Sequence, residues 1–458
     1  MSAPETSETP EEPDQPASAR PSSSGEAGRP AITAPGAEPE LAGRLFTRPF
    51  VGLLGMQAAY GFSFSMFFLL PKYLAAVGEP PARIGFVMAG FGVACVLTIP
   101  FLRAIVEGLG PRLTLMTANL LLAGAAAVFA VVDRPGVMAI PLRASEGVTW
   151  TLMFSTAITL TAELAPPDRL AQAIGLAGGA SLIMNAVAPA IGEPLADRFG
   201  YRSAFFVAAL SAIGAAALAR RLTIPGSRPT VPANALPAAP AAPIGGTVSP
   251  PEAAGGRASL YVVFGVAGLA FSVLFTFLAP YALADGVRAV RLFFIGYTAS
   301  AILVRVLGGR ISDRLGHGLV AAAALLLYGG AVASAGLLGA HHLFLLGVSF
   351  GTAHGAAFPA LMALLIHGTP PRRRPGVLGM ANGAMSLGIC AVYPAGVVAA
   401  RLGYPALFAI AGGLTAASAA LLVPFHRRAH RVAGPSRAVS LAGRSALRPP
   451  APAPRRAR

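Results

Sequence analysis

The chain repeats part of itself at an offset of about 204 residues, and this repeat constrains the fold more than any other feature. Glycines, prolines, an arginine and a phenylalanine recur without a gap: Gly147, Phe154, Pro166, Pro167, Arg169, Gly175 and Gly179 match Gly351, Phe358, Pro370, Pro371, Arg373, Gly379 and Gly383. At an offset of 203, Arg198, Gly200, Tyr201 and Phe205 match Arg401, Gly403, Tyr404 and Phe408. A chain of this kind is expected to fold into two similar halves.

Each half contains six long apolar segments. A hydrocarbon core about 30 Å thick needs roughly 20 apolar residues per helix, and only 12% of this chain is charged, against about 25% in soluble proteins. We predict an all-α integral membrane protein with 12 transmembrane helices in two pseudo-symmetric six-helix bundles. The predicted spans are 49–76, 84–106, 113–133, 136–163, 170–195 and 202–222, then 258–283, 289–312, 317–338, 341–367, 375–400 and 404–424.

The composition changes outside these segments. Residues 1–43 are rich in Pro, Ser, Glu and Ala and lack the apolar core of a signal peptide, so we expect a disordered N-terminal tail. The bundles are predicted at 44–222 and 258–425, joined by a Pro/Ala-rich cytoplasmic linker at 223–257. Residues 426–458 are predicted to form a basic, disordered C-terminal tail.

The formal net charge of +16 does not indicate nucleic-acid binding, because the arginines are concentrated in the C-terminal tail and at the ends of apolar runs. If both termini lie inside, inner flanks carry seventeen basic residues and outer flanks eight, which favours cytoplasmic termini. The two cysteines, Cys95 and Cys390, fall within apolar runs and indicate neither a disulfide nor a metal site.

A glycine-rich charged motif separates the eighth and ninth predicted spans. It reads Gly309-Arg310-Ile311-Ser312-Asp313-Arg314-Leu315-Gly316-His317. This motif resembles the G-x-x-x-D-R-x-G-R/K signature of the major facilitator superfamily. The resemblance implies a fold of two six-helix bundles and a gating turn whose contacts form in one transport conformation and break in the other. A solvated turn is the alternative.

The corresponding turn after the second span departs from that signature. Gly110 and Arg112 still match, but Glu107 stands where an aspartate is expected and Gly108 replaces the arginine. The family usually keeps this motif best in the first half. A gating role for Glu107, Gly110 and Arg112 is therefore an expectation that depends on the resemblance alone.

The fourth span carries a charged pair. Arg143 to Gly147 resembles the R-x-x-x-G element that the superfamily associates with proton-coupled transport. Arg143 and Glu146 are three residues apart and lie on nearly the same helix face. A carboxyl beside a fixed cation can load and release a proton as its surroundings change. The alternative is a structural ion pair. The second repeat has Gly347 and Phe350 at these positions.

Two further polar residues fall within apolar spans. His354 in the tenth span is a candidate proton relay, because imidazole titrates near neutral pH, and a packing histidine is the alternative. Arg305 in the eighth span is a candidate contact for an anionic substrate, unless its side chain reaches toward the interface.

The fifth span resembles, loosely, the Gly/Pro-rich element of the superfamily's antiporters. Gly179, Pro189 and Gly192 fit that element, whereas Ala188 and Glu193 depart from it. Close helix packing explains these residues nearly as well.

Members of the superfamily build their central cavity from the first, fourth, seventh and tenth helices. The resemblance therefore directs attention to polar and aromatic residues near that cavity, although aromatic residues at such spacing are often lipid-facing or core. The candidate cavity residues are Gln57, Tyr60, Phe62, Asn185, Phe271, Phe275, Arg305 and Phe358.

We expect a transporter and not an enzyme, because these motifs serve transport. The leading hypothesis is proton-coupled efflux of small organic molecules by alternating access, driven by a proton gradient with no cofactor. Proton-coupled uptake of a sugar or organic anion is the alternative, and a non-transporting membrane sensor a remote one. Expected partners are a small-molecule substrate and the lipid bilayer, with no nucleic acid, and the protein is expected to be a monomer. One lysine against 34 arginines is typical of a GC-rich bacterial genome. Together with the missing signal peptide, this suggests a multi-pass protein of a bacterial inner membrane.

Overall fold

The computed structural model describes residues 45–166, 169–222, 251–287, 289–307, 315–367, 369–370 and 373–422. All regular elements in these ranges are helices. The first half contains α1 (Arg48–Met66), η2 (Phe67–Leu69), α2 (Leu70–Ala76), α3 (Pro81–Thr98), η3 (Ile99–Phe101), α4 (Leu102–Val131), η4 (Gly136–Met138), α5 (Ala139–Leu164), α6 (Leu170–Phe199) and α7 (Tyr201–Arg221).

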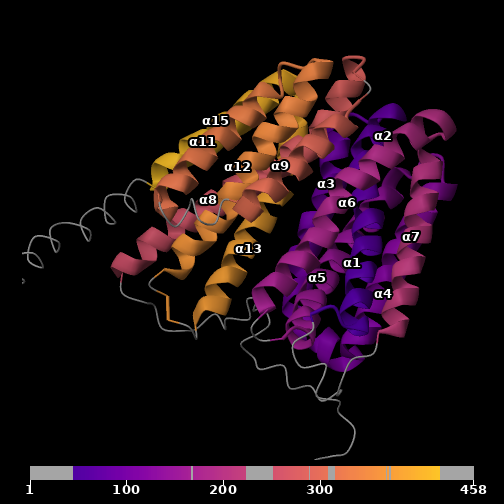
Figure 1. Ribbon diagram of the computed structural model, residues 1–458. Coiled ribbons are helices and arrows are strands. Elements are labelled where there is room, and N and C mark those ends of the chain that lie inside the picture. The colour runs from indigo at the N-terminus through magenta and orange to yellow at the C-terminus, as the bar shows by residue number, and fades with distance from the viewer. Residues whose placement is uncertain are drawn as a thin grey trace, which may run out of the picture. The chain divides into compact units, whose positions relative to one another are not determined.

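The second half follows the same order. It contains α8 (Pro251–Ala284), α9 (Arg291–Leu307), α11 (His317–Ser334), α12 (Ala340–Ile366), α13 (Arg374–Cys390), α14 (Val392–Leu402), α15 (Tyr404–Ser418) and η7 (Ala419–Leu422). Helices α1 to α7 form one bundle and α8 to α15 a second (Figure 1). We call them the first and second bundles.

The described helices are consistent with the 12 predicted spans. Among the described residues, nine helical stretches are long and apolar enough to cross a membrane, and one of them, Pro81–Val131, holds two predicted spans. Gly110, with φ of +75°, and Pro111 divide that stretch. The other two spans are α5, which carries buried charges, and α9, which has 17 described residues. The surface also carries many exposed apolar side chains, as a lipid-facing surface requires.

Helix α8 begins before the predicted boundary of the second bundle. The linker prediction covers residues 223–257, but the helix starts at Pro251. Proline suits the first turn of a helix, where its missing N–H needs no partner, and Glu252, Ala253 and Ala254 are good helix formers. The helix and the predicted linker therefore overlap at 251–257, and the membrane-length apolar stretch begins at Arg257.

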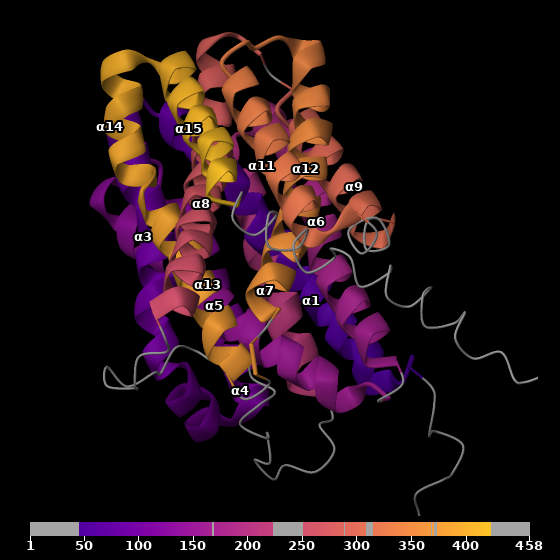
Figure 2. The same cartoon turned by 90° about the vertical axis from the view of Figure 1, so that its left-hand side faces the viewer.

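The internal repeat is visible in how the helices pack. A Cβ on Gly90 of α3 would lie 3.3 Å from the carbonyl oxygen of Ile140, and a Cβ on Gly296 of α9 would lie 2.6 Å from that of Phe344. These two contacts are related by the repeat and bring α3 against α5 and α9 against α12. Small residues allow such close approach of membrane helices. Figure 2 shows α8, α13, α14 and α15 of the second bundle from another side.

Glycines with positive φ mark repeat-related turns. Gly200 and Gly403 have φ of +82° and +83°, and Gly110 and Gly316 have φ of +75° and +87°. Only glycine adopts this conformation without strain. We call the end of the bundles that holds Gly200 and Gly403 the distal end, and the end that holds Gly110 and Gly316 the terminal end.

Candidate functional site

Arg143 and Glu146 form an ion pair inside the first bundle. The Arg143 guanidinium Nη1 donates to Glu146 Oε2. Glu146 is fully buried and Arg143 is 7% exposed. The guanidinium carbon also lies 4.8 Å from the centre of the Phe91 ring on α3, a cation–π distance. The pair is thus held by its own helix and by its neighbour.

The polar atoms of this pair are not all satisfied. Glu146 Oε1 and Arg143 Nε are buried with no hydrogen-bond partner among the described residues. Gln57 Nε2, on α1, is buried and lacks a partner in the same part of the chain. The Tyr60 hydroxyl, also on α1, is buried and likewise has no hydrogen-bond partner among the described residues. Because unsatisfied buried polar groups are costly, such a cluster is typical of a site that exchanges partners.

Glycine packing sets the position of the pair. A Cβ on Gly147 would meet the carbonyl oxygen of Phe91, so only glycine lets α5 lie this close to α3. Cys95, one turn further along α3, directs its thiol to the Gly147 carbonyl oxygen at 3.4 Å. The R-x-x-x-G spacing thus places the charged residues beside a very close helix contact.

In the second bundle, His354 takes part in an aromatic cluster. Its Nδ1 lies 3.3 Å from the Tyr297 hydroxyl oxygen. The rings around it belong to Phe271, Tyr297, Tyr328, Phe350 and Phe358. The imidazole has a hydrogen-bond partner and dense ring contacts, so its environment is that of a packed core residue.

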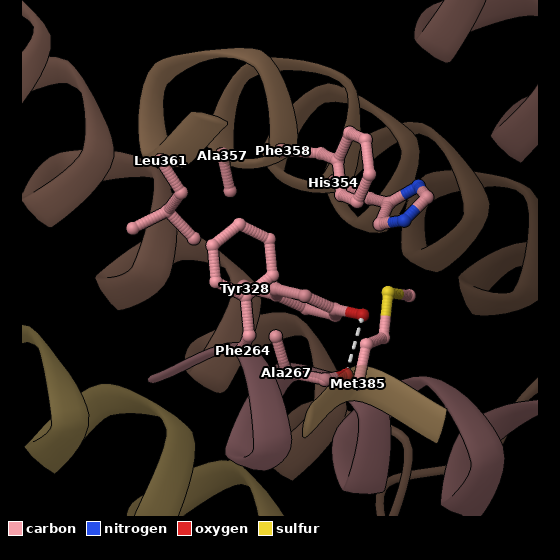
Figure 3. A pocket seen from close by; sticks show the side chains of 8 residues that line it. All are labelled: Phe264, Ala267, Tyr328, His354, Ala357, Phe358, Leu361 and Met385. Atoms are coloured by element: carbon pink, nitrogen blue, oxygen red, sulfur yellow. Dashed lines mark hydrogen bonds between the residues drawn. The ribbon is translucent and has the colours of Figure 1, made fainter. Parts of the chain in front are cut away.

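A small apolar pocket adjoins this cluster. His354, Phe358 and Leu361 of α12 line one side, and the Tyr328 hydroxyl donates to the Ala267 carbonyl oxygen of α8 at 3.2 Å (Figure 3). Met385 of α13 completes the lining. The predicted cavity residue Phe358 therefore faces a pocket within the second bundle.

Aromatic rings join the two bundles. Phe68, in η2 of the first bundle, stacks on Phe294 of α9 at 5.3 Å and meets Phe275 of α8 edge-on at 5.1 Å. Phe275 in turn stacks on Phe271 at 4.1 Å. The predicted residues Phe271 and Phe275 thus lie in one ring cluster that reaches the bundle interface.

The remaining predicted cavity residues have different surroundings. Asn185 of α6 accepts a hydrogen bond from Ser65 of α1 at 2.7 Å, within the first bundle. Phe62 is half-buried and packs against the core. Arg305 is exposed and has no ion pair among the described residues. It lies seven and eleven residues after Thr298 and Phe294, on the same face of α9.

The predicted gating residues fall into two groups. Gly309, Asp313 and Arg314 lie outside the described residues, whereas Gly316 forms the turn before α11. In the first half, Glu107 pairs with Arg103 on the same helix at 2.7 Å, and both are exposed. The Arg112 guanidinium donates to the Arg220 carbonyl oxygen at the end of α7.

Sequence reasoning missed a charged cluster at the distal end. Lys72 Nζ lies 2.5 Å from Glu193 Oε1, and both side chains are buried. Glu193 also accepts hydrogen bonds from the backbone amides of Val290 and Arg291 in the second bundle. Two signals were available: Lys72 is the only lysine of the chain, and Glu193 interrupts a Gly-Pro pattern.

Two repeat-related helical bundles with apolar surfaces and a buried charged pair define the architecture of a secondary transporter. The sequence matches the family model of the Major Facilitator Superfamily over residues 51–318 and 260–455. Together these segments span most of the chain, which therefore belongs to the Major Facilitator Superfamily. Secondary transport of small molecules by a multi-pass membrane protein follows from this membership.

Solved structures share the fold. A mutant of the nucleoside transporter NupG superposes with a TM-score of 0.70 at 13% identity, covering 82% of this chain and 99% of that one. The human organic anion transporter MFSD10 (TETRAN) superposes with a TM-score of 0.57 at 19% identity, with the same coverage. Among curated proteins, no sequence matches this chain.

Proposed function

We propose that this protein is a proton-coupled exporter of small organic molecules that works by alternating access, with Glu146 as the proton carrier. The observation that carries the proposal is the buried Arg143–Glu146 pair, in which Glu146 Oε1 has no hydrogen-bond partner in the described chain. A proton can bind at this oxygen while Oε2 stays near Arg143. Intramembrane charged residues are costly and commonly mark proton or substrate pathways.

The aromatic interface supports the choice of substrate class. Phe68, Phe275 and Phe294 meet where the two bundles touch, and their faces are apolar. Aromatic rings bind flat or amphipathic molecules by stacking and by cation–π contact. A substrate with an aromatic or apolar body therefore suits this site better than a heavily hydroxylated one.

Proton movement in proteoliposomes tests the role of Glu146. Wild type is compared with Glu146→Gln while amphipathic cations, sugars and organic acids are added in turn. Glu163→Gln is the matched control, because Glu163 is an exposed carboxyl on the same helix. We expect substrate-triggered proton release in wild type and in the control, and its loss in Glu146→Gln.

Each outcome has a definite meaning. Release that survives in Glu146→Gln places the proton site elsewhere, with His354 the next candidate. Uptake of protons together with substrate, in place of release, replaces export by symport. No response to any compound overturns proton coupling for this panel and leaves uniport or a non-transporting membrane sensor.

A second candidate function is proton-coupled uptake of an organic anion or sugar. Arg305 favours it, because this exposed cation has no ion pair in the described chain and lies on the face of α9 that carries Phe294 toward the first bundle. MFSD10, which shares the fold, is an organic anion transporter. Arg305→Gln would abolish anion transport under this hypothesis and leave export of amphipathic cations intact under the first.

We also propose a bacterial inner-membrane location with the terminal end in the cytoplasm. Arg48 at the start of α1 and Arg220 and Arg221 at the end of α7 lie at this end, as the positive-inside rule requires. A reporter that fluoresces only in the cytoplasm, fused after α15, tests the orientation. A dark fusion with full-length protein in the membrane contradicts it.

A further inference from the structure

At the distal end, donors from both bundles converge on the side chain of Glu193. From its own bundle it receives Lys72 Nζ at 2.5 Å. From the second bundle it receives the amide of Val290 at 3.2 Å and that of Arg291 at 2.8 Å, and the Arg291 guanidinium lies 3.5 Å away. Only 1% of Glu193 is exposed.

The two amides belong to Arg291, the first residue of α9, and to Val290, the residue just before it. The first N–H groups of a helix have no partner within the helix, and its N-terminus carries a partial positive charge. A side chain just before the helix normally satisfies these groups. Here the other bundle supplies the carboxylate, so the start of α9 is capped by Glu193 only while the bundles touch at this end.

The repeat-related contact between the two bundles, that of α3 with α14, is made through glycines, unlike the contact of Glu193 with α9. Helix α3 meets α14 through Gly85 and Gly396, where a Cβ on Gly85 would lie 3.1 Å from the Gly396 Cα. Gly85 and Arg291 are 206 residues apart, the same separation as the repeat-related Gly110 and Gly316. Glu193 and Gly396 are 203 residues apart, as are Gly200 and Gly403. The two glycines therefore correspond to Arg291 and Glu193. The α3–α14 contact is therefore made by the backbones of two glycines, whereas its repeat-related counterpart is made by hydrogen bonds to the Glu193 carboxylate.

We propose that Glu193 is the latch of the distal gate: its carboxylate caps α9 across the interface in the distal-closed state and must leave α9 when that end opens. Lys72 lies in the same bundle as Glu193, so it stays with the carboxylate as the bundles separate. Charge-assisted hydrogen bonds are the strong ones, and two of them cross the interface here. The latch is independent of substrate, coupling ion and direction.

Distances between spin labels on the full-length protein in lipid nanodiscs test the latch. A label pair at Val137 and Leu337 reports the distal end, and a pair at Leu109 and Leu315 reports the terminal end. All four side chains are exposed. Cys95 and Cys390 are replaced by alanine, so that only the introduced cysteines react.

We expect Glu193→Ala to lengthen the distal distances and shorten the terminal ones. The distal-open population should rise by at least about tenfold, because the loss of even one charge-assisted bond implies a change of that size. Glu193→Gln keeps the shape and an acceptor oxygen, so its shift is smaller, about threefold. Asp197→Asn is the matched control. It removes a carboxylate 4.0 Å from Lys72 that is 44% exposed, and it leaves wild-type distances.

Wild-type distance distributions in both Glu193 variants overturn the latch. If Glu193→Ala fails to reach the membrane, Glu193→Gln alone decides. An Asp197→Asn shift as large as that of Glu193→Gln also overturns it, because general charge balance around Lys72 would then explain the effect. Proton coupling through Glu146 is unaffected by any of these results.

Discussion

The two halves of the chain share their glycine helix contacts at repeat-related positions but differ in the side chains next to those glycines. Gly147 and Gly351 are related by the repeat, and each brings its helix against a backbone carbonyl, that of Phe91 in one case and that of Tyr297 in the other. Four residues earlier in each helix, the first bundle has Arg143 and the second has Gly347.

The side chains also differ between the two halves at the position one residue before each glycine. Glu146 is a buried carboxylate, whereas Phe350 packs among the rings around His354. The lesson is that helix packing and chemistry are encoded by different positions. Glycines preserve the architecture in both halves, and the neighbouring positions are free to make one half charged and the other aromatic.

Breaking the charged pair should give the largest effect. Arg143→Ala leaves Glu146 buried without its cation, and removal of one partner of a buried pair costs about 3–5 kcal/mol. Arg143→Ala/Glu146→Ala should be more stable than Arg143→Ala alone, because no unpaired charge remains. Thermal unfolding of the purified protein in detergent measures both. A double variant less stable than the single one would show that the pair is not the dominant interaction.

The glycine contacts shared by the two halves are tested by replacing one glycine in each half with alanine, which adds one methyl group. Gly147→Ala and Gly351→Ala should each destabilise the protein by about 1–3 kcal/mol, because the new Cβ meets a backbone carbonyl that has no room to move. Gly175→Ala is the control, since no atom lies within 4 Å of a Cβ there. Yield of folded protein and unfolding temperature are the readouts. Unequal effects in the two halves would contradict the equivalence of the contacts.

A substitution of His354, in the aromatic cluster of the second half, is expected to have a smaller effect on stability. His354→Phe removes the hydrogen bond to the Tyr297 hydroxyl and keeps a ring among the aromatic neighbours, at a cost of about 1 kcal/mol. We expect the variant to retain substrate-triggered proton release. Loss of release in a folded His354→Phe protein would move proton coupling into the second half.

The smallest effect is expected at the turn of the first half that departs from the superfamily signature, around Glu107 and Gly110. Glu107→Gln removes an exposed pair with Arg103 on the same helix, and such pairs contribute about 0.5 kcal/mol or less. Transport should be unchanged. A clear loss of transport in Glu107→Gln would restore the gating role that the resemblance predicts for this turn.

The sequence predicted the architecture because the fold depends on periodic and repeated features. Apolar segments of membrane length lie where the helices are found, and repeated glycines such as Gly147 and Gly351 lie at close helix contacts. The pairing of Arg143 with Glu146 was also accessible, since residues three apart share a helix face.

The distal cluster could not be predicted in the same way. Lys72 and Glu193 are 121 residues apart, and Glu193 and Val290 are 97 apart. The donor from Val290 is a backbone amide, which every residue except proline carries. Its role depends on where α9 begins and on which helix lies opposite, and these are properties of the assembled bundles.

The single lysine provides the protein with a built-in chemical probe. Apart from an α-amino group, Lys72 is the only primary amine in the sequence, and its side chain is 3% exposed in the distal-closed arrangement. Amine-selective reagents that stay in water can therefore modify one side chain only, and only when the distal end admits them. The rate at which the peptide that contains Lys72 acquires a mass increment in the unmutated protein becomes a direct reading of how often that end opens, with neither introduced labels nor a known substrate.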